Sequence, residues 1–120
     1  MAMRMFGAVT EGLEQALDLY EARHRVLTEN VANADTPGYR ARDLDFGNAL
    51  DAAFESGTAP SPDKLQPTVD RSATVKIDNN SVDLDTQMGK LSENAFKIVA
   101  LSQILARRYD ALKRTIDGGK

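Results

Sequence analysis

The sequence contains no cysteine. Disulfide bonds, thiol catalysis and thiolate metal sites are therefore excluded, and cysteine usage indicates no redox compartment. Tryptophan is also absent, and only four phenylalanines and three tyrosines occur among 120 residues that are 42% hydrophobic. A chain of this length fits one domain, and so few large side chains predict a thin fold with little core.

Long hydrophobic runs and an excess of positive charge are missing as well. No stretch approaches the roughly 18 apolar residues of a membrane span, and residues 1–6 lack the apolar run of a secretory signal. Fifteen Lys and Arg against 18 Asp and Glu give a net charge of -3, which argues against nucleic acid or an anionic membrane as the main partner. We therefore expect protein partners, no direct membrane insertion, and no cleaved signal if the protein leaves the cytoplasm.

Two long heptad patterns are what the sequence does contain. In the first, residues recur alternately four and three apart, and Thr10 is a plausible N-cap followed by acidic residues. This pattern predicts a helix over residues 10–35, which Pro37 and Gly38 end with a sharp turn. Its members are Leu13, Leu17, Tyr20, His24, Leu27, Val31 and Ala34.

The second pattern occupies the other end of the chain and has the same spacing over more than four heptads. It predicts a helix over residues 82–117, with Ser81 or Asp83 as its cap. The members of this pattern are Leu84, Met88, Leu91, Ala95, Ile98, Ser102, Leu105, Tyr109, Leu112 and Ile116.

Residues 36–81, between the two patterns, predict a turn, a short helix and a linker. An aromatic or leucine side chain recurs every fourth residue from Phe46 to Phe54, which indicates the short helix. Residues 56–81 hold three of the four prolines and many small polar residues, a composition typical of a linker. Only Thr74–Ile77 alternates enough to suggest a strand.

The lengths of the two predicted helices decide how they pack. At roughly 1.5 Å per residue they extend about 38 and 52 Å, longer than a small globule needs, so they should pack lengthwise. We predict one domain over residues 1–120, of the mainly α class, whose N- and C-terminal helices pair as an antiparallel coiled-coil-like hairpin with a short irregular, β-containing middle segment. The residues predicted to pack are Leu13, Leu17, Leu27, Val31, Leu84, Leu91, Ile98, Leu105 and Leu112.

Further apolar residues widen the surface of the second helix beyond one contact line. Phe96, Val99, Leu101 and Ile104 lie beside its heptad pattern. A helix with so wide an apolar surface has a second neighbour to cover. Because this chain has no third long helix, we expect that neighbour to be another subunit.

Catalytic, cofactor and metal sites find little support among the residue types. The single histidine, His24, falls on the first heptad pattern, where one polar residue often sets helix register. The pairs Asp43/Asp45 and Asp83/Asp85 could suggest acid/base chemistry, but each flanks a predicted helix start, and we favour a capping role. We therefore predict no catalytic residue, no cofactor and no metal.

One segment carries a resemblance to a known family. The sequence ENVANADTPGYRARDLDF, from Glu29 to Phe46, closely resembles the N-terminal signature of bacterial flagellar rod and hook proteins. The sequence NSVDLDT, from Asn80 to Thr86, is similar to the start of the last helix in proximal-rod members. The resemblance covers residues 10–50 and 78–117.

The resemblance implies a structural, non-enzymatic subunit of the flagellar basal-body rod. Such proteins pair their terminal helices and pack them against neighbours in the inner tube of the axial drive shaft. The implied partners are copies of the chain, other rod proteins, an adaptor of the FliE type, the membrane ring complex at the rod base and the flagellar type III export apparatus. The implied location is the periplasm-spanning rod, reached without signal cleavage.

The resemblance also assigns residues. The turn residues Asn30, Asn33, Thr36, Pro37, Gly38 and Tyr39 would shape the approach to the next subunit. Phe46 and Leu50 match the Phe-x-x-x-apolar gate motif of early flagellar export substrates, although simple packing of a short helix explains them equally well. A rival function, based on the same heptad patterns and acidic balance, is a cytoplasmic helical adaptor or chaperone that binds an amphipathic partner helix.

Overall fold

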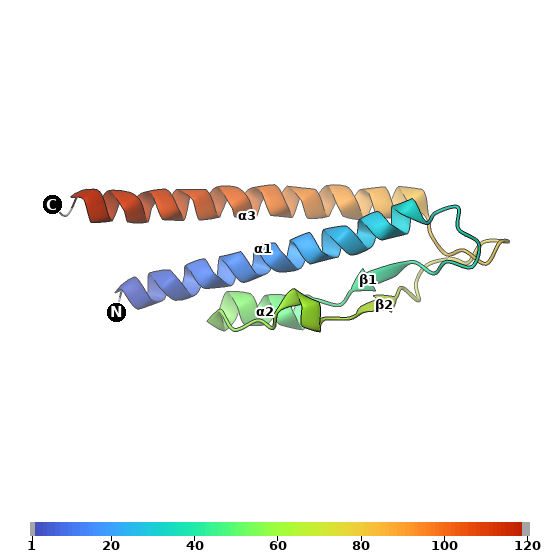
Figure 1. The fold of residues 1–120 in the computed structure, drawn as a ribbon, viewed down its shortest axis with the longest axis horizontal. Coiled ribbons are helices and arrows are strands. Elements are labelled where there is room, and N and C mark those ends of the chain that lie inside the picture. Colours follow the sequence, from blue (N-terminus) through green and yellow to red (C-terminus); the bar gives the residue numbers. More distant parts are fainter. Residues whose placement is uncertain (1, 119–120) are drawn as a thin grey trace.

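The molecule is an elongated helical hairpin in the computed structural model, which describes residues 2–118. Its principal extents are 67 × 21 × 17 Å. The long helices α1 and α3 lie side by side and antiparallel, with both chain ends at one end of the molecule (Figure 1). The elements in chain order are α1 (Ala2–Ala32), β1 (Arg42–Leu44), α2 (Gly47–Ser56), the 3-10 helix η1 (Pro62–Lys64), β2 (Pro67–Val69) and α3 (Leu84–Gly118).

The hairpin confirms the predicted pairing, but α1 begins earlier than expected. Thr10 lies in the interior of α1, where it is buried and accepts a 3.2 Å hydrogen bond from Nε of Arg108. The prediction of a start at Thr10 was therefore wrong. Residues 2–9 include alanine, methionine and arginine, which favour helix, and no proline, so the helix continues through a sequence that only resembles a cap.

The end of α1 and the start of α3 follow the sequence signals. Gly38 has a φ of +79°, the left-handed conformation that glycine adopts without strain. At the start of α3, Oδ1 of Asp83 accepts hydrogen bonds from the backbone N–H of Asp85 at 3.0 Å and of Thr86 at 3.4 Å. Asp83 is thus the cap of α3, while the Ser81 hydroxyl accepts a hydrogen bond from the backbone N–H of Ala41.

Helix α2 packs on α1 at a point of very close approach (Figure 1). A β-carbon on Gly12 would overlap the carbonyl oxygen of Ala53, so only glycine lets the two backbones meet there. The side-chain amide of Gln15 then donates to the Gly57 carbonyl and accepts from the Ala59 N–H, both at 2.8 Å. These contacts fix the end of the predicted short helix on α1.

The middle of the chain contains β structure, as predicted, but the strands lie at other positions. The expected strand at Thr74–Ile77 is not formed, and the two-stranded antiparallel sheet instead pairs Arg42 with Val69 and Leu44 with Pro67. Residues 56–81 are not only a linker, because they contribute η1, β2 and the buried residues Asn80 and Ser81. Alternation alone misplaced the strand, since polar bonds to α1 and α3 select which segments pair.

The hydrophobic core is thin, as the composition predicts. One cluster joins Ala16 of α1, Ala53 of α2 and Leu101 of α3. A second, at the loop end, joins Ala34, Ala41 and Val82. Small side chains dominate both clusters, so close backbone approach contributes more to this packing than large side chains do.

We predict that Gly12→Val releases α2 from α1. The valine side chain would overlap the Ala53 carbonyl, and we expect a loss of about 1 to 3 kcal/mol in the free energy of unfolding, together with faster hydrogen exchange over α2. Gly7→Val is the matched control, because a β-carbon at Gly7 meets nothing within 4 Å on the same helix. Equal destabilisation by both variants would contradict the proposed contact.

Candidate functional site

The turn after α1 is organised around the fully buried amide of Asn30. Its Nδ2 donates to the Arg42 carbonyl at 2.6 Å and to Oε1 of Gln87 at 2.9 Å. Its Oδ1 accepts from the Arg42 N–H at 3.0 Å and from the Tyr39 hydroxyl at 3.1 Å. One side chain thus ties the end of α1 to the turn, to β1 and to α3.

A second buried asparagine, Asn80, closes the same turn from the other side. Its Nδ2 donates to the carbonyls of Asn33 at 2.9 Å and Thr36 at 2.6 Å, and its Oδ1 accepts from the Val82 N–H at 2.7 Å. Asn80 lies within the segment that resembles proximal-rod members, but no role was predicted for it. Its position three residues before Asp83, the cap of a long helix, was the available signal.

The turn residues predicted from the resemblance lie together but differ in exposure. Asn30 is buried, Asn33 and Tyr39 are half-buried, and Thr36, Pro37 and Gly38 are exposed. The Thr36 hydroxyl donates to Oδ1 of Asn33 at 3.1 Å. The two asparagines and the tyrosine therefore hold the turn from within, while its outer surface faces solvent.

The contact between α1 and α3, here called the seam, repeats every seven residues along α3. The residues of α3 that face α1 are here called the asparagine line, after Asn94. Gln87 of this line accepts a hydrogen bond from Asn30, and Asn94 donates to the Tyr20 carbonyl at 2.8 Å. Nδ1 of His24 lies 3.3 Å from the same Asn94 amide, so His24 is a seam residue as predicted. The asparagine line is Gln87, Asn94, Leu101 and Arg108.

The seam is therefore rotated relative to the predicted heptad. The predicted leucine line of Leu91, Ile98, Leu105 and Leu112 is half-buried to buried, and the other predicted line, here called the outer line, faces away from α1. Both sets have the same spacing, so periodicity could not choose between them. The outer line is Met88, Ala95, Ser102, Tyr109 and Ile116.

The predicted packing residues divide accordingly. Leu27 is fully buried and Leu84, at the first turn of α3, is exposed. Leu13, Leu17 and Val31 are half-buried on α1. Four buried apolar residues of α1 were not predicted, because they lie beside or between the members of the heptad pattern. They are Ala16, Leu19, Ala22 and Val26.

Phe46 and Leu50 pack against α1. The Phe46 ring meets the Tyr20 ring edge-on, with centroids 5.3 Å apart, and the Arg23 guanidinium lies 5.0 Å from its centroid. Leu50 contacts the cluster around Ala16. Both residues of the predicted export motif are half-buried in the folded chain.

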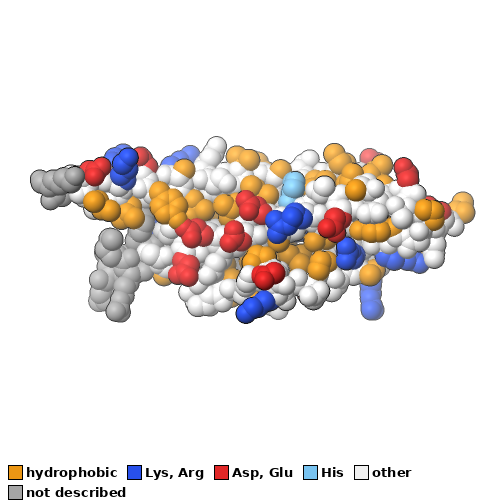
Figure 2. All heavy atoms as spheres, viewed as in Figure 1, with side chains coloured by type: hydrophobic (Ala, Val, Ile, Leu, Met, Phe, Trp, Pro, Cys, Tyr) orange, Lys and Arg blue, Asp and Glu red, His pale blue; other side chains and the backbone are white. Residues whose placement is uncertain are grey.

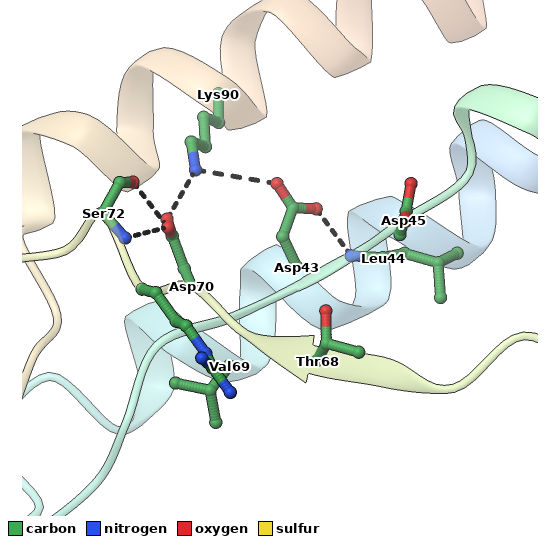
Figure 3. A pocket seen from close by; sticks show the side chains of 9 residues that line it. Asp43, Leu44, Asp45, Thr68, Val69, Asp70, Ser72 and Lys90 are labelled. Carbon is green, nitrogen blue, oxygen red and sulfur yellow. Dashed lines mark hydrogen bonds and ion pairs between the residues drawn. The ribbon is translucent and has the colours of Figure 1, made fainter.

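A group of ion pairs joins α1, the sheet and α3 beside an open hollow of about 380 Å³ (Figure 3). Arg23 holds Asp43 through two 2.9 Å hydrogen bonds, and Lys90 lies 3.6 Å from Asp43 and 3.2 Å from Asp70. The N–H and hydroxyl of Ser72 donate to Asp70. The pair Asp43/Asp45 therefore does not cap α2 as predicted, since Asp43 is occupied by these cations and α2 has no side-chain cap.

The pKa shifts in this group have physical causes. Burial alone would raise the pKa of Asp43, but hydrogen bonds and charge from Arg23, with help from the Leu44 N–H and Lys90, lower the pKa below its usual value. Hydrogen bonds from Ser72, followed by the contact with Lys90, lower the pKa of Asp70. Both carboxylates are thus held ionised, which suits ion pairing rather than proton transfer.

We predict that Asn30→Asp strongly destabilises the fold. The carboxylate would face the Arg42 carbonyl and Oε1 of Gln87 with no proton to donate, and we expect a loss of about 3 kcal/mol at neutral pH, measured by denaturant unfolding. The loss should shrink at acidic pH, where a protonated carboxyl can donate again. Asn48→Asp, on the exposed surface of α2, is the control with the same charge change, and a comparable loss there would refute the assignment.

Comparison with known proteins identifies the family. No protein-family model matches the chain. It is 30% identical to the flagellar basal body rod protein FlgB of Bacillus subtilis, over 98% of this chain and 100% of that protein. It is 35% identical to FlgB of Cereibacter sphaeroides over 87% of this chain and 90% of that protein, and 29% identical to FlgB of Salmonella typhimurium over 88% and 91%. The chain belongs to the FlgB family of flagellar basal body rod proteins.

Proposed function

We propose that this chain, a structural subunit of the flagellar basal-body rod, assembles by packing the uncovered face of α3 against neighbouring subunits. The observation that carries the proposal is the exposure of large hydrophobic side chains along α3. Figure 2 shows such side chains along the edge of the molecule where α3 lies. The exposed residues are Leu84, Met88, Phe96, Val99, Ile104, Tyr109 and Ile116.

The geometry of α3 explains why one neighbour does not satisfy it. Helix α1 covers the asparagine line and the leucine line, while most of the outer line stays in water. Val99 lies three to four residues from Ala95 and Ser102 and extends the same face. A helix with three apolar or packing lines needs a second partner, and so many exposed large hydrophobic side chains on one helix mark a protein interface.

The polar seam supports assembly by fixing how that face is presented. Asn30 and Asn94 bind polar groups of the opposite helix at defined positions, so α3 cannot slide along α1 without leaving buried amides unpaired. A rigid helix pair presents its outer line in one register. Repeated identical contacts along a rod require that constancy.

The partners and location follow the same proposal. They are copies of this chain, other rod proteins, a FliE-type adaptor and the ring complex at the rod base, with the flagellar type III export apparatus as the route. Over residues 2–118, no helix is long and apolar enough to cross a membrane. The adaptor alternative would also use an exposed apolar face, and no observation favours it over the rod subunit.

The proposal assigns the chain no catalytic role. The carboxylates beside the open hollow are paired with Arg23 and Lys90. In the described part of the chain, no three His, Cys, Asp or Glu side chains are grouped so as to hold a metal ion. The exposed face of α3 supports a role in packing, for which the proposal requires no reactive group.

We predict that Val99→Asp removes the subunit from basal bodies while leaving it folded. Val99 is 55% exposed and points away from the seam, so the substitution should barely change the free energy of unfolding but places a carboxylate in the proposed interface. Quantifying the subunit in purified basal bodies and scoring motility tests this. Phe54→Asp, at a 54% exposed position on α2, is the control, and normal assembly of the Val99 variant would end the proposal.

We also predict that Phe46→Ala lowers secretion while cytoplasmic levels persist. Phe46 packs on Tyr20 and Arg23, so its loss weakens the folded state, and a role in packing alone would leave export of the unfolded chain equal or faster. Reduced secretion therefore identifies an export signal. Phe54→Ala, on the helix α2 that follows Phe46, is the control. Equal secretion of the parent chain and both variants would show that Phe46 is not part of an export motif.

A further inference from the structure

The loop Thr74–Asp78 lies at the end of the molecule opposite the two chain ends (Figure 1), and two of its residues, Val75 and Ile77, are apolar. Ile77 is fully exposed and Val75 is 48% exposed. Both residues line the same open hollow at the surface of the loop. Neither belongs to the hydrophobic clusters of the chain.

The loop that carries them is firmly held. The backbone N–H of Lys76 donates to the Asn80 carbonyl at 2.7 Å, and the Asp78 carbonyl accepts from the Gly38 N–H at 3.0 Å. The Lys76 ammonium donates to the Ala34 carbonyl at 3.2 Å. The two apolar side chains are therefore displayed on a fixed support.

Beside this loop lies a hollow of about 370 Å³ lined by both apolar and charged residues. Ala34, Val82 and Leu84 are its apolar residues, and Asp35 and Asp83 contribute two carboxylates against the one cation of Lys76, whose ammonium donates to the Ala34 carbonyl. Within the described residues, the Asp35 side chain makes no hydrogen bond or ion pair. A complementary surface would combine apolar side chains with a cation.

Such a surface exists at the other end of α3. Tyr109 and Ile116 of the outer line are exposed, and Lys113 lies between them on the same face. Arg107 and Arg114 are exposed nearby. Because the molecule is 67 Å long, the loop and this basic end of α3 cannot meet within one chain.

We propose that the loop of one copy, through Val75 and Ile77, docks on the Tyr109–Ile116 surface of a second copy. The carboxylates of Asp35 and Asp83 then face Lys113. This proposal deepens the proposed function and rests on it. The contact joins two different surfaces, so it adds copies end to end and does not close as a symmetric dimer.

The absence of cysteine makes the contact directly testable. An Ile77→Cys chain and a Tyr109→Cys chain, purified separately and mixed under mild oxidation, should give a mixed disulfide dimer. One chain carrying both substitutions should give a ladder of oligomers. High salt, and Asp35→Lys in the Ile77→Cys chain, should each cause loss of the mixed dimer, because both weaken the charge contact.

The controls distinguish this contact from random collision. Ile77→Cys mixed with Phe54→Cys pairs two exposed sites, but Asp51 and Glu55 flank Phe54, so no mixed dimer is expected. Equal cross-linking to both partners, or cross-linking of Ile77→Cys only to itself, overturns the proposal. So does cross-linking of Ile77→Cys in basal bodies solely to a different rod protein.

A failed cross-link is separable from failure of the proposed function. If Val99→Asp abolishes assembly while no cross-link forms between copies, the proposed packing of the uncovered α3 face is supported and the proposed end-to-end contact is rejected. If the cross-link forms while Val99→Asp assembles normally, the end-to-end contact is supported and the packing of the α3 face is rejected.

Discussion

The fold depends on the burial of one amide, that of Asn30. Its four hydrogen bonds reach the turn, β1 and α3, which are otherwise held together by few large side chains. A buried amide without partners would cost more than its net contribution when paired, so this site permits one arrangement of the three segments. The buried amide of Asn80 makes similar hydrogen bonds from the opposite side of the turn.

Buried hydrogen bonds are important in this molecule because its hydrophobic core is thin. Helices α1 and α2 approach through Gly12, and α1 and α3 meet along a line in which Gln87 and Asn94 are polar. Apolar contact alone would tolerate several registers of such narrow helices. The polar pairs select one register and leave the larger hydrophobic side chains of α3 for contact outside the chain.

The sequence was sufficient for the long helices, their antiparallel pairing and the turn at Gly38, because these depend on local periodicity and on backbone conformation. It could not place the seam, since the asparagine line and the outer line have equal spacing on either side of Leu91 and Ile98. Only the three-dimensional partners of Asn94 decide between them. The overlooked signal was the polar pair Gln87 and Asn94, seven residues apart, with Arg108 two heptads further on.

The strand and the start of α1 were mispredicted for related reasons. Thr74–Ile77 alternates like a strand, but β2 pairs with β1 because Asn30 and Arg23 hold β1 against α1. Thr10 resembles a cap, yet nothing before it stops a helix. In both cases the sequence contained a valid local pattern, and contacts distant in sequence determined whether it was used.

The order of the helices in the chain also sets the order in which the packing surfaces of the molecule can form. The segments that cover one side of α1, β1 and α2, follow it directly in the chain, whereas α3 begins about fifty residues after α1 ends. A chain emerging N-terminus first can therefore complete the α1–α2 contact early and must wait for its last third to close the seam. Because the outward hydrophobic face of α3 belongs to that last third, a partly emerged chain lacks the surface that we propose packs against neighbouring subunits.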